Sequence, residues 1–131
     1  MTNVVTFARA LADATRWRIV KMAMTEAVCV CELADVLGMP QSTVSSHVQI
    51  IRKAEILESE KCEKWTYFRV MPAVSKLLVA MEEAFPEMDE QCEADAKKLK
   101  ERLSQRVDSC CPGPKRLATR KNSRSRKTMC S

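Results

Sequence analysis

A break between two helical patterns, at residues 38–40, constrains the fold of this chain more than any other feature of its sequence. Residues 32–37 have the apolar spacing of a short helix, and Gly38 fits the left-handed position that commonly ends one. Pro40 prevents that helix from continuing, because its ring excludes the preceding helical geometry and removes a backbone N–H. A second helical pattern starts at Ser42, a favourable N-cap residue. Helix, sharp turn of about four residues and helix together predict a helix-turn-helix.

Two further helices are predicted before this motif. Residues 5–11 and 14–24 carry apolar side chains at helical spacing. Either Asp13 or Thr15 is suited to cap the second of these helices, because both side chains can accept hydrogen bonds from free backbone amides.

The sequence pattern changes to a period of two between residues 56 and 70. Trp65, Tyr67 and Arg69 alternate with Thr66, Phe68 and Val70. This alternation predicts two short strands joined by a charged turn at Lys61–Lys64. A β-hairpin directly after a helix-turn-helix is typical of a wing, so the predicted fold is mainly α with a small β-hairpin, a winged helix-turn-helix.

A last long helix is predicted from Pro72 to about Val107, with Pro86 kinking or splitting it. Its apolar residues form a stripe: Leu77 or Leu78, Met81, Phe85, Met88, Cys92, Leu99 and Leu103. Such a stripe is either core or a dimer seam, and the small size of the rest of the chain favours the seam of a symmetric homodimer. Residues 1–107 are therefore predicted to form the DNA-binding and dimerisation domain.

The C-terminal residues differ in composition from this domain. Residues 108–131 are rich in Ser, Pro, Gly and basic residues, which predicts a flexible, basic, Cys-containing tail. Seven basic residues and no acidic ones lie between Lys115 and Ser131. Subtracting these seven from 22 leaves 15 basic residues against 17 acidic ones, so the net charge of +5 resides in the tail. A basic tail suits a polyanionic partner, although solvated basic tails are also common.

Seven cysteines in the chain point to thiol chemistry. No signal for export and no membrane-spanning apolar stretch is visible, so a cytoplasmic location and no membrane partner are expected. Thiols stay reduced in such a compartment, which favours metal binding or redox sensing over structural disulfides.

The start of the second helix of the motif carries the candidate DNA-reading residues. In a helix-turn-helix these positions meet base edges in the major groove, where Gln can read adenine and Ser or Thr can contact bases or phosphates. The candidates are Gln41, Ser42, Thr43, Ser45, Ser46 and His47. Arg52, Lys53, Lys61 and Lys64 would contact phosphates, which position the protein on DNA without specifying sequence. A lone histidine is more often structural than a ligand, so His47 is not favoured as a metal ligand.

The set of motifs LADATRWRIVKMA, VCVCELADVLGMPQSTVSSHVQIIRKAEIL and ESEKCEKWTYFRV resembles the ArsR/SmtB family of metal-sensing repressors, and specifically its arsenic-responsive branch. The resemblance covers residues 5–72 well and the last helix more loosely. It implies a dimer that binds operator DNA without ligand and is released when thiolates capture the inducer. By position it implies Cys29 and Cys31 as inducer ligands, a recognition helix from Ser42 and a wing at Lys61–Tyr67.

Three positions depart from the family pattern. Ala34 stands where the best-known arsenic sensors carry a third cysteine, three residues beyond the CxC pair. Glu55 and Glu63 stand where the family has glycines, after the recognition helix and in the turn of the wing.

The pair Cys29 and Cys31 can chelate one ion only on suitable backbone. On an α-helix, side chains two residues apart diverge by roughly 200°, whereas on extended backbone they share a face. Chelation therefore favours non-helical backbone at the start of the short helix, whose displacement would disturb the recognition helix packed on it. Arsenite is expected to take three thiolates, whereas zinc normally takes four ligands.

Cys110 and Cys111 are the favoured source of a third sulfur, because they are adjacent and lie just beyond the last predicted helix. They could reach the CxC pair of either subunit. The other three cysteines have alternative roles: seam packing for Cys92, oxidant sensing at the wing tip for Cys62, and a free tail thiol for Cys130.

The main hypothesis is thus a repressor of an arsenic-resistance system, induced by arsenite, As(III), or antimonite, with double-stranded operator DNA as partner. A thiol-redox or persulfide sensor of the same fold and a zinc or cadmium sensor are the alternatives. A metal-storage or metallochaperone protein is a third class, and the helix-turn-helix argues against it. An enzyme, and hence a catalytic cofactor, is least expected, because there is one histidine, two glycines and no phosphate-cradling loop.

Overall fold

The computed structural model describes residues 2–86, 89–106 and 111–119. Its helices are α1 (Val4–Leu11), α2 (Ala14–Thr25), α3 (Val30–Leu37), α4 (Gln41–Lys53), α5 (Pro72–Ala84), α6 (Asp89–Ser104) and α7 (Arg116–Thr119). Its strands, β1 (Val28–Cys29), β2 (Leu57–Cys62) and β3 (Trp65–Val70), form an antiparallel sheet in the order β1-β3-β2. The predicted fold class, mainly helical with a small β-hairpin, is confirmed.

The helix-turn-helix consists of α3 and α4, and its turn follows the predicted chemistry. Gly38 has φ +67°, in the left-handed region, and its amide donates to the carbonyl of Ala34 at 2.8 Å. The predicted cap at Ser42 is wrong. Pro40, in extended backbone, is the N-cap residue, and α4 begins one residue earlier at Gln41 because the Pro40 carbonyl already accepts from Val44.

At the start of α2 the choice between two capping residues is resolved. The Asp13 carboxylate accepts from the amide of Arg16 at 3.0 Å, so Asp13 rather than Thr15 is the cap. Backbone donation by Arg16 lowers the pKa of Asp13, because the hydrogen bond stabilises the charged form.

The two glutamates at the family's glycine positions adopt the backbone geometry that glycine would favour. Glu55, after α4, has φ +62°, and Glu63, in the turn between β2 and β3, has φ +58°. For a residue with a side chain this conformation costs roughly 1–2 kcal/mol. The substitutions therefore retain the turn geometry at an energetic cost, and Glu63 places a carboxylate in the turn of the wing.

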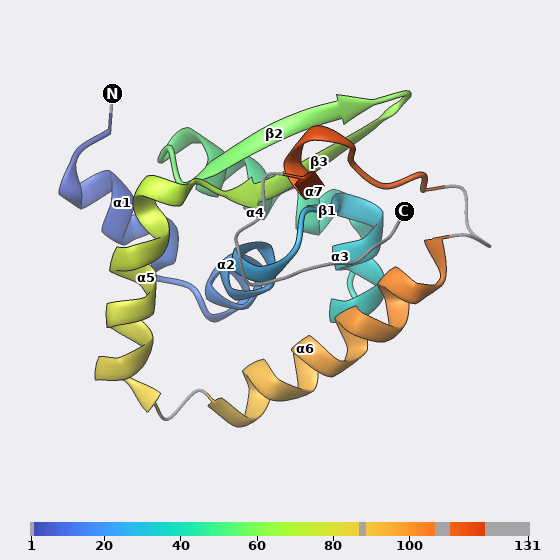
Figure 1. Cartoon of the computed structure of the whole chain (residues 1–131). Helices are drawn as coiled ribbons and strands as arrows, with labels where there is room; N and C mark the ends of the chain where they lie inside the picture. The colour runs from blue at the N-terminus through green and yellow to red at the C-terminus, as the bar shows by residue number, and fades with distance from the viewer. Residues whose placement is uncertain (1, 87–88, 107–110, 120–131) are drawn as a thin grey trace.

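One hydrophobic core lies between α2, α3, α4 and the inner face of the hairpin. Figure 1 shows α6 running along α3 on the side of the molecule away from the wing. The predicted last helix is split near Pro86, with α5 ending at Ala84 and α6 beginning at Asp89.

The apolar stripe of the last predicted helix does not lie on one seam. Leu78 and Leu99 are buried in the core of this chain, and Met81 and Leu103 pack against that core. Phe85, in contrast, is 63% exposed. The stripe is therefore partly core, because the split at Pro86 turns α5 and α6 in different directions (Figure 1).

The segment after α6 returns to the body of the protein. Of the residues predicted as a flexible tail, 111–119 are described, and within them Cys111 and Leu117 are each 1% exposed. Residues 108–110 and 120–131 lie outside the described residues. None of the described helices is long and apolar enough to cross a membrane.

Candidate metal centre and nucleic-acid interface

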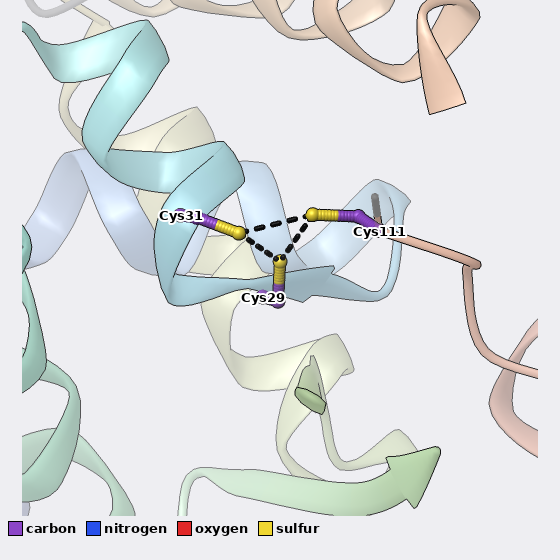
Figure 2. A group of neighbouring side chains, drawn as sticks. All are labelled: Cys29, Cys31 and Cys111. Carbon is purple, nitrogen blue, oxygen red and sulfur yellow. Dashed lines mark hydrogen bonds between the residues drawn. The ribbon is translucent and has the colours of Figure 1, made fainter. Parts of the chain in front are cut away.

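Three cysteine sulfurs meet at the start of α3. The Sγ atom of Cys31 lies 3.1 Å from that of Cys29 and 3.0 Å from that of Cys111, and the third sulfur–sulfur distance is 3.7 Å. Figure 2 shows all three side chains pointing toward one another. Cys29 and Cys111 are buried, and Cys31 is half-buried. The structure thus brings the CxC pair together with one of the two favoured tail cysteines.

The backbone around the CxC pair changes conformation between the two cysteines. Cys29 is the last residue of β1 and the N-cap of α3, with extended φ −102° and ψ 169°. Cys31 already lies in the first turn of the helix. Only one of the two residues is therefore extended, which differs from the predicted non-helical pair. Because Cys29 lies outside the helix as its N-cap, its side chain does not diverge from that of Cys31 as two side chains two residues apart on a helix would.

Cys111 reaches the pair because the chain after α6 is fixed to the wing. The amide of Gly113 donates to the Tyr67 hydroxyl at 2.7 Å. Gly113 has φ +90°, and a Cβ at this position would lie 3.2 Å from the Arg106 guanidinium. The turn that follows Cys111 thus requires glycine for both its backbone conformation and its close approach to Arg106.

The start of α3 carries a buried carboxylate, Glu32, which is 0% exposed. Its two oxygens accept from Arg106 Nε at 2.6 Å and Nη2 at 2.9 Å, and the second nitrogen also donates to the Ala27 carbonyl. Glu32 Oε1 also accepts from the Cys29 amide at 3.2 Å. This buried ion pair joins the beginning of α3 to Arg106, the second residue after α6. Sequence reasoning missed it, since the two residues are 74 positions apart and only Glu32 lies in a motif.

Two thiols of the cysteine cluster, those of Cys29 and Cys111, have raised pKa values, which favours their protonated forms. Burial, with the nearby Glu32 carboxylate, raises the pKa of the Cys29 thiol far above its ordinary value. Burial and the Cys31 sulfur raise the pKa of Cys111, while Cys29 and the Arg102 guanidinium at 3.7 Å act in the opposite direction. Thiols that bind an ion as thiolates therefore give up their protons, to solvent for a metal cation or to the leaving hydroxides for arsenite.

Three sulfur donors with no nitrogen or oxygen among them suit a soft, thiophilic ion. A metal–thiolate bond of about 2.3 Å gives sulfur–sulfur separations of roughly 3.5 Å around one centre. The observed separations are close to this, so small side-chain shifts suffice to enclose an ion. Structural zinc normally takes four ligands, and three is the number expected for a trivalent metalloid.

The remaining cysteines have separate positions. Cys62, at the end of β2, is 8% exposed and packs in the same apolar cluster as Cys111 and Leu117. Cys92 is half-buried on α6. Neither belongs to the three-sulfur group, and Cys110 and Cys130 lie outside the described residues.

The candidate DNA-reading residues form the accessible face of α4. Gln41, Ser42, Thr43 and Ser46 are exposed and Ser45 is half-buried. The opposite face of the helix, with Val44, Val48 and Ile51, is fully buried in the core. Arg52, Lys53, Lys61 and Lys64 are exposed, so the side chains predicted to contact phosphate are accessible.

His47 differs from the other candidates on α4. It is half-buried, and its Nδ1 lies 3.3 Å from Arg16 Nη1. The same guanidinium donates to the Ala10 carbonyl through Nε at 2.7 Å. His47 therefore contacts the α1–α2 region of its own chain, and it does not lie in the cysteine cluster.

A surface groove connects the metal centre with the candidate DNA-reading elements. It is lined by Cys29 and Cys31, by Gln41, Ser45 and Gln49 of α4, and by Lys64, Trp65 and Thr66 of the hairpin, with Val30 and Phe68. The three α4 residues are spaced by four, so they follow one face of the helix. The cysteine pair thus opens onto the space between the recognition helix and the wing.

The helix-turn-helix, the hairpin after it and the exposed polar face of α4 define the class of winged helix-turn-helix proteins. Among solved structures, the homodimeric winged helix-turn-helix DNA-binding domain of a possible ArsR-family regulator from Mycobacterium bovis matches with a TM-score of 0.61 and 22% identity. The match covers 67% of this chain and 82% of that one. The crystal structure of the AntR antimony-specific transcriptional repressor matches with a TM-score of 0.54 and 27% identity, over 67% of this chain and 80% of that one.

Sequence comparisons identify the family. The family described as bacterial regulatory proteins of the arsR family matches residues 13–59. An uncharacterized HTH-type transcriptional regulator of Methanocaldococcus jannaschii is 36% identical over 48% of this chain and 72% of its own length. The arsenic resistance transcriptional regulator ArsR1 of Pseudomonas putida is 36% identical over 56% of this chain, which spans 58% of that relative. This chain belongs to the arsR family, and it is a transcriptional regulator and not an enzyme.

Proposed function

We propose that this protein is a repressor that binds operator DNA as a homodimer and is released when arsenite or antimonite binds to Cys29, Cys31 and Cys111. The observation that carries the proposal is the meeting of three sulfurs within 3.7 Å at the first turn of the helix-turn-helix. The named relatives and the antimony-specific neighbour are consistent with such an inducer.

The DNA side of the proposal rests on the exposed face of α4 and on the hairpin. Gln41, Ser42, Thr43, Ser45 and Ser46 would meet base edges, with His47 behind them. Arg52, Lys61 and Lys64 would bind phosphates. In a symmetric dimer the two recognition helices would read an inverted repeat with half-sites about one helical turn apart.

Release follows from the position of the sulfurs relative to α3 and α4. Cys29 and Cys31 lie on either side of the start of α3, and α3 packs directly on α4. An ion that draws three sulfurs into one coordination sphere fixes the start of α3 against the segment that carries Cys111. The inducer would release DNA if the arrangement of α3 and α4 that the ion stabilises binds the operator less tightly.

Charge balance favours a trivalent metalloid over a divalent metal. Arsenite enters as the neutral As(OH)₃. Three thiols replace its three hydroxides and give them their protons, so three waters leave and the product As(SR)₃ is also neutral. A divalent cation on three thiolates would leave one net negative charge in a buried site. That charge would lie beside Glu32, whose own charge is already compensated by Arg106.

The experiment that tests the proposal is fluorescence anisotropy of the reduced protein on labelled DNA from its own promoter region. Arsenite, zinc, cadmium and peroxide are titrated separately. Release at low micromolar arsenite, without release by zinc or peroxide, is the expected result. Specific binding that ignores arsenite would overturn the inducer, and absence of specific binding would overturn the repressor.

A thiol-redox repressor of the same fold is the second candidate. The pairs Cys29–Cys31 and Cys31–Cys111, at 3.1 and 3.0 Å, are close enough to form a disulfide with small movements. In that case peroxide or persulfide would release DNA, and a thiol reductant would restore binding. Arsenite would leave the protein on DNA even when it is bound to the cysteines.

A further inference from the structure

The outer face of the hairpin holds the segment that carries Cys111. In the register of β2 and β3, Glu60 lies opposite Tyr67 and Glu58 lies opposite Arg69, so these side chains share one face of the sheet. Two residues of this face on β3 contact the segment. The Tyr67 hydroxyl accepts from the Gly113 amide, and Arg69 Nη1 donates to the Leu117 carbonyl at 3.3 Å.

The strongest connection on this face is made by Glu60. One of its carboxylate oxygens accepts from the amide of Lys115 at 3.0 Å, and the other accepts from the amides of Arg116 and Leu117 at 2.9 and 2.8 Å. These amides lie at the start of the short helix α7, where backbone N–H groups cannot donate within the helix. Three charge-assisted hydrogen bonds from consecutive amides hold this turn on the wing, and Leu117 is buried beside it.

The spacing along the chain relates this attachment to the cysteine cluster. Cys111 is four residues before Lys115, and the segment is held at Gly113 and again at 115–117. On its other side the chain is held by Arg106, through Glu32. With both ends fixed, Cys111 has little freedom to leave the cysteine pair. Of the attachments to this face of the hairpin in the described part of the chain, the one at Glu60 has the most hydrogen bonds, three against one each for Tyr67 and Arg69.

We propose that Glu60 is a positioning residue for the third thiolate, holding Cys111 at the CxC pair by binding the amides of residues 115–117. The inducer site and the wing are then parts of one connected unit. Capture of an ion by Cys111 acts on β2 and β3 as well as on α3. This inference deepens the proposed function and rests on it for the identity of the ion, but the positioning itself can be tested without any inducer.

The test is disulfide trapping in a Cys110→Ser, Cys130→Ser background. Diamide oxidises two thiols to a disulfide and is reduced to the hydrazine, taking up the two protons and two electrons. Peptide mapping by mass spectrometry then gives the rate at which Cys111 is joined to Cys29 or Cys31 within one chain. Glu60→Ala is expected to lower this rate by at least about tenfold, the effect of losing a charge-assisted hydrogen bond, and to divert oxidation to the Cys29–Cys31 pair.

The control is Glu63→Gln, which changes the charge of the same wing by a similar amount at an exposed residue of the turn. In this variant Cys111 is expected to be trapped as fast as in the Cys110→Ser, Cys130→Ser protein. The trapping rate of Glu60→Gln is expected to lie between that of this protein and that of Glu60→Ala. An unchanged trapping rate in Glu60→Ala, or an equal loss in Glu63→Gln, would overturn the proposal. Thermal melting of each variant shows whether the fold is retained.

Arsenite binding supplies the second arm. Glu60→Ala should weaken arsenite binding, and the double variant Glu60→Ala, Cys111→Ser should bind no more weakly than Cys111→Ser alone, because a positioning residue acts only through its cysteine. Additive losses would overturn the proposal. If the unaltered protein does not bind arsenite, the proposed function fails, while the trapping experiment still decides whether Glu60 positions Cys111.

Discussion

The recognition helix and the cysteine cluster differ in how the chain builds them. The exposed polar face of α4 comes from residues close together in sequence, between Gln41 and Ser46, on one helix whose other side is buried. The cysteine cluster combines the end of β1, the first turn of α3 and a residue 80 positions further on. The first surface depends mainly on local structure. The second depends on contacts between α6, the wing and the C-terminal segment, so it can be changed by substitutions distant from its sulfurs.

The largest effect is expected from removing the two cysteines that α3 and β1 contribute. Cys29→Ser with Cys31→Ser should abolish release of DNA by arsenite, because one remaining sulfur cannot chelate. Operator affinity without inducer should stay within about threefold, since α4 is unchanged. Anisotropy with and without arsenite measures both. Retained release would show that other cysteines sense the inducer.

The buried ion pair should contribute most to the stability of the nonlocal site. Arg106→Met leaves the Glu32 carboxylate buried without its bidentate partner, and this is expected to lower the free energy of unfolding by about 3–5 kcal/mol. Urea denaturation followed by circular dichroism measures it. Arg102→Met is the matched control, since its partner Asp35 is 60% exposed and the pair should contribute less than about 1 kcal/mol. Equal losses in the two variants would contradict a special role for the buried pair.

Removal of the third sulfur alone should have an intermediate effect. Cys111→Ser leaves the CxC pair able to chelate, so arsenite affinity is expected to fall by roughly 10- to 100-fold without being lost. Isothermal titration of reduced protein measures the affinity, with Cys92→Ser as the matched control on α6. An affinity equal to that of the unaltered protein would place the third ligand elsewhere.

A substitution on α4 tests whether the proposed DNA-reading surface is independent of the cysteine cluster. Gln41→Ala should weaken specific operator binding by about tenfold, the effect of one lost base contact. Arsenite affinity should be unchanged, because the sulfurs are held by other residues. Loss of arsenite affinity in this variant would mean that the groove lined by Gln41 and the cysteines forms part of the inducer site.

The smallest effect on stability is expected from the attachment at Glu60. Burial raises the pKa of this carboxyl, but the three amides of Leu117, Arg116 and Lys115 lower it more, so the net pKa is below its ordinary value. A lowered pKa in the folded state contributes stability above the unfolded-state value. That stability is lost as pH falls from about 4.5 through the lower folded value. The free energies of unfolding of the unaltered protein and of Glu60→Gln, measured by denaturation at a series of pH values, should therefore converge in acid. A constant difference between them down to the lowest pH would contradict this.

The sequence predicted the local elements well and the nonlocal contacts poorly. Gly38, Pro40 and the alternation after residue 56 act through backbone geometry within a few residues, so they located the helix-turn-helix and the hairpin. The cap of α4 was misassigned to Ser42 because proline in extended backbone can take that position without a side-chain hydrogen bond.

The cysteine cluster was only partly predictable, because it depends on contacts between residues far apart in the sequence. The CxC spacing marked Cys29 and Cys31, but it did not choose between Cys110 and Cys111 or show that a segment of basic composition packs on the wing. Glu60 and Glu32 carry no sequence signal, because a charged residue on a strand or in a first helical turn is ordinarily solvated. Their roles depend on partners supplied by the folding of α6 and the segment after it.

The most direct test of the three-sulfur site is X-ray absorption at the arsenic edge, with one equivalent of arsenite bound to the reduced protein and to Cys111→Ser. Three sulfurs around arsenic are predicted for the unaltered protein. Two sulfurs and one oxygen are predicted for Cys111→Ser. Three sulfurs in both samples, or two in both, would show that Cys111 is not the third ligand and would contradict the site described by the structure.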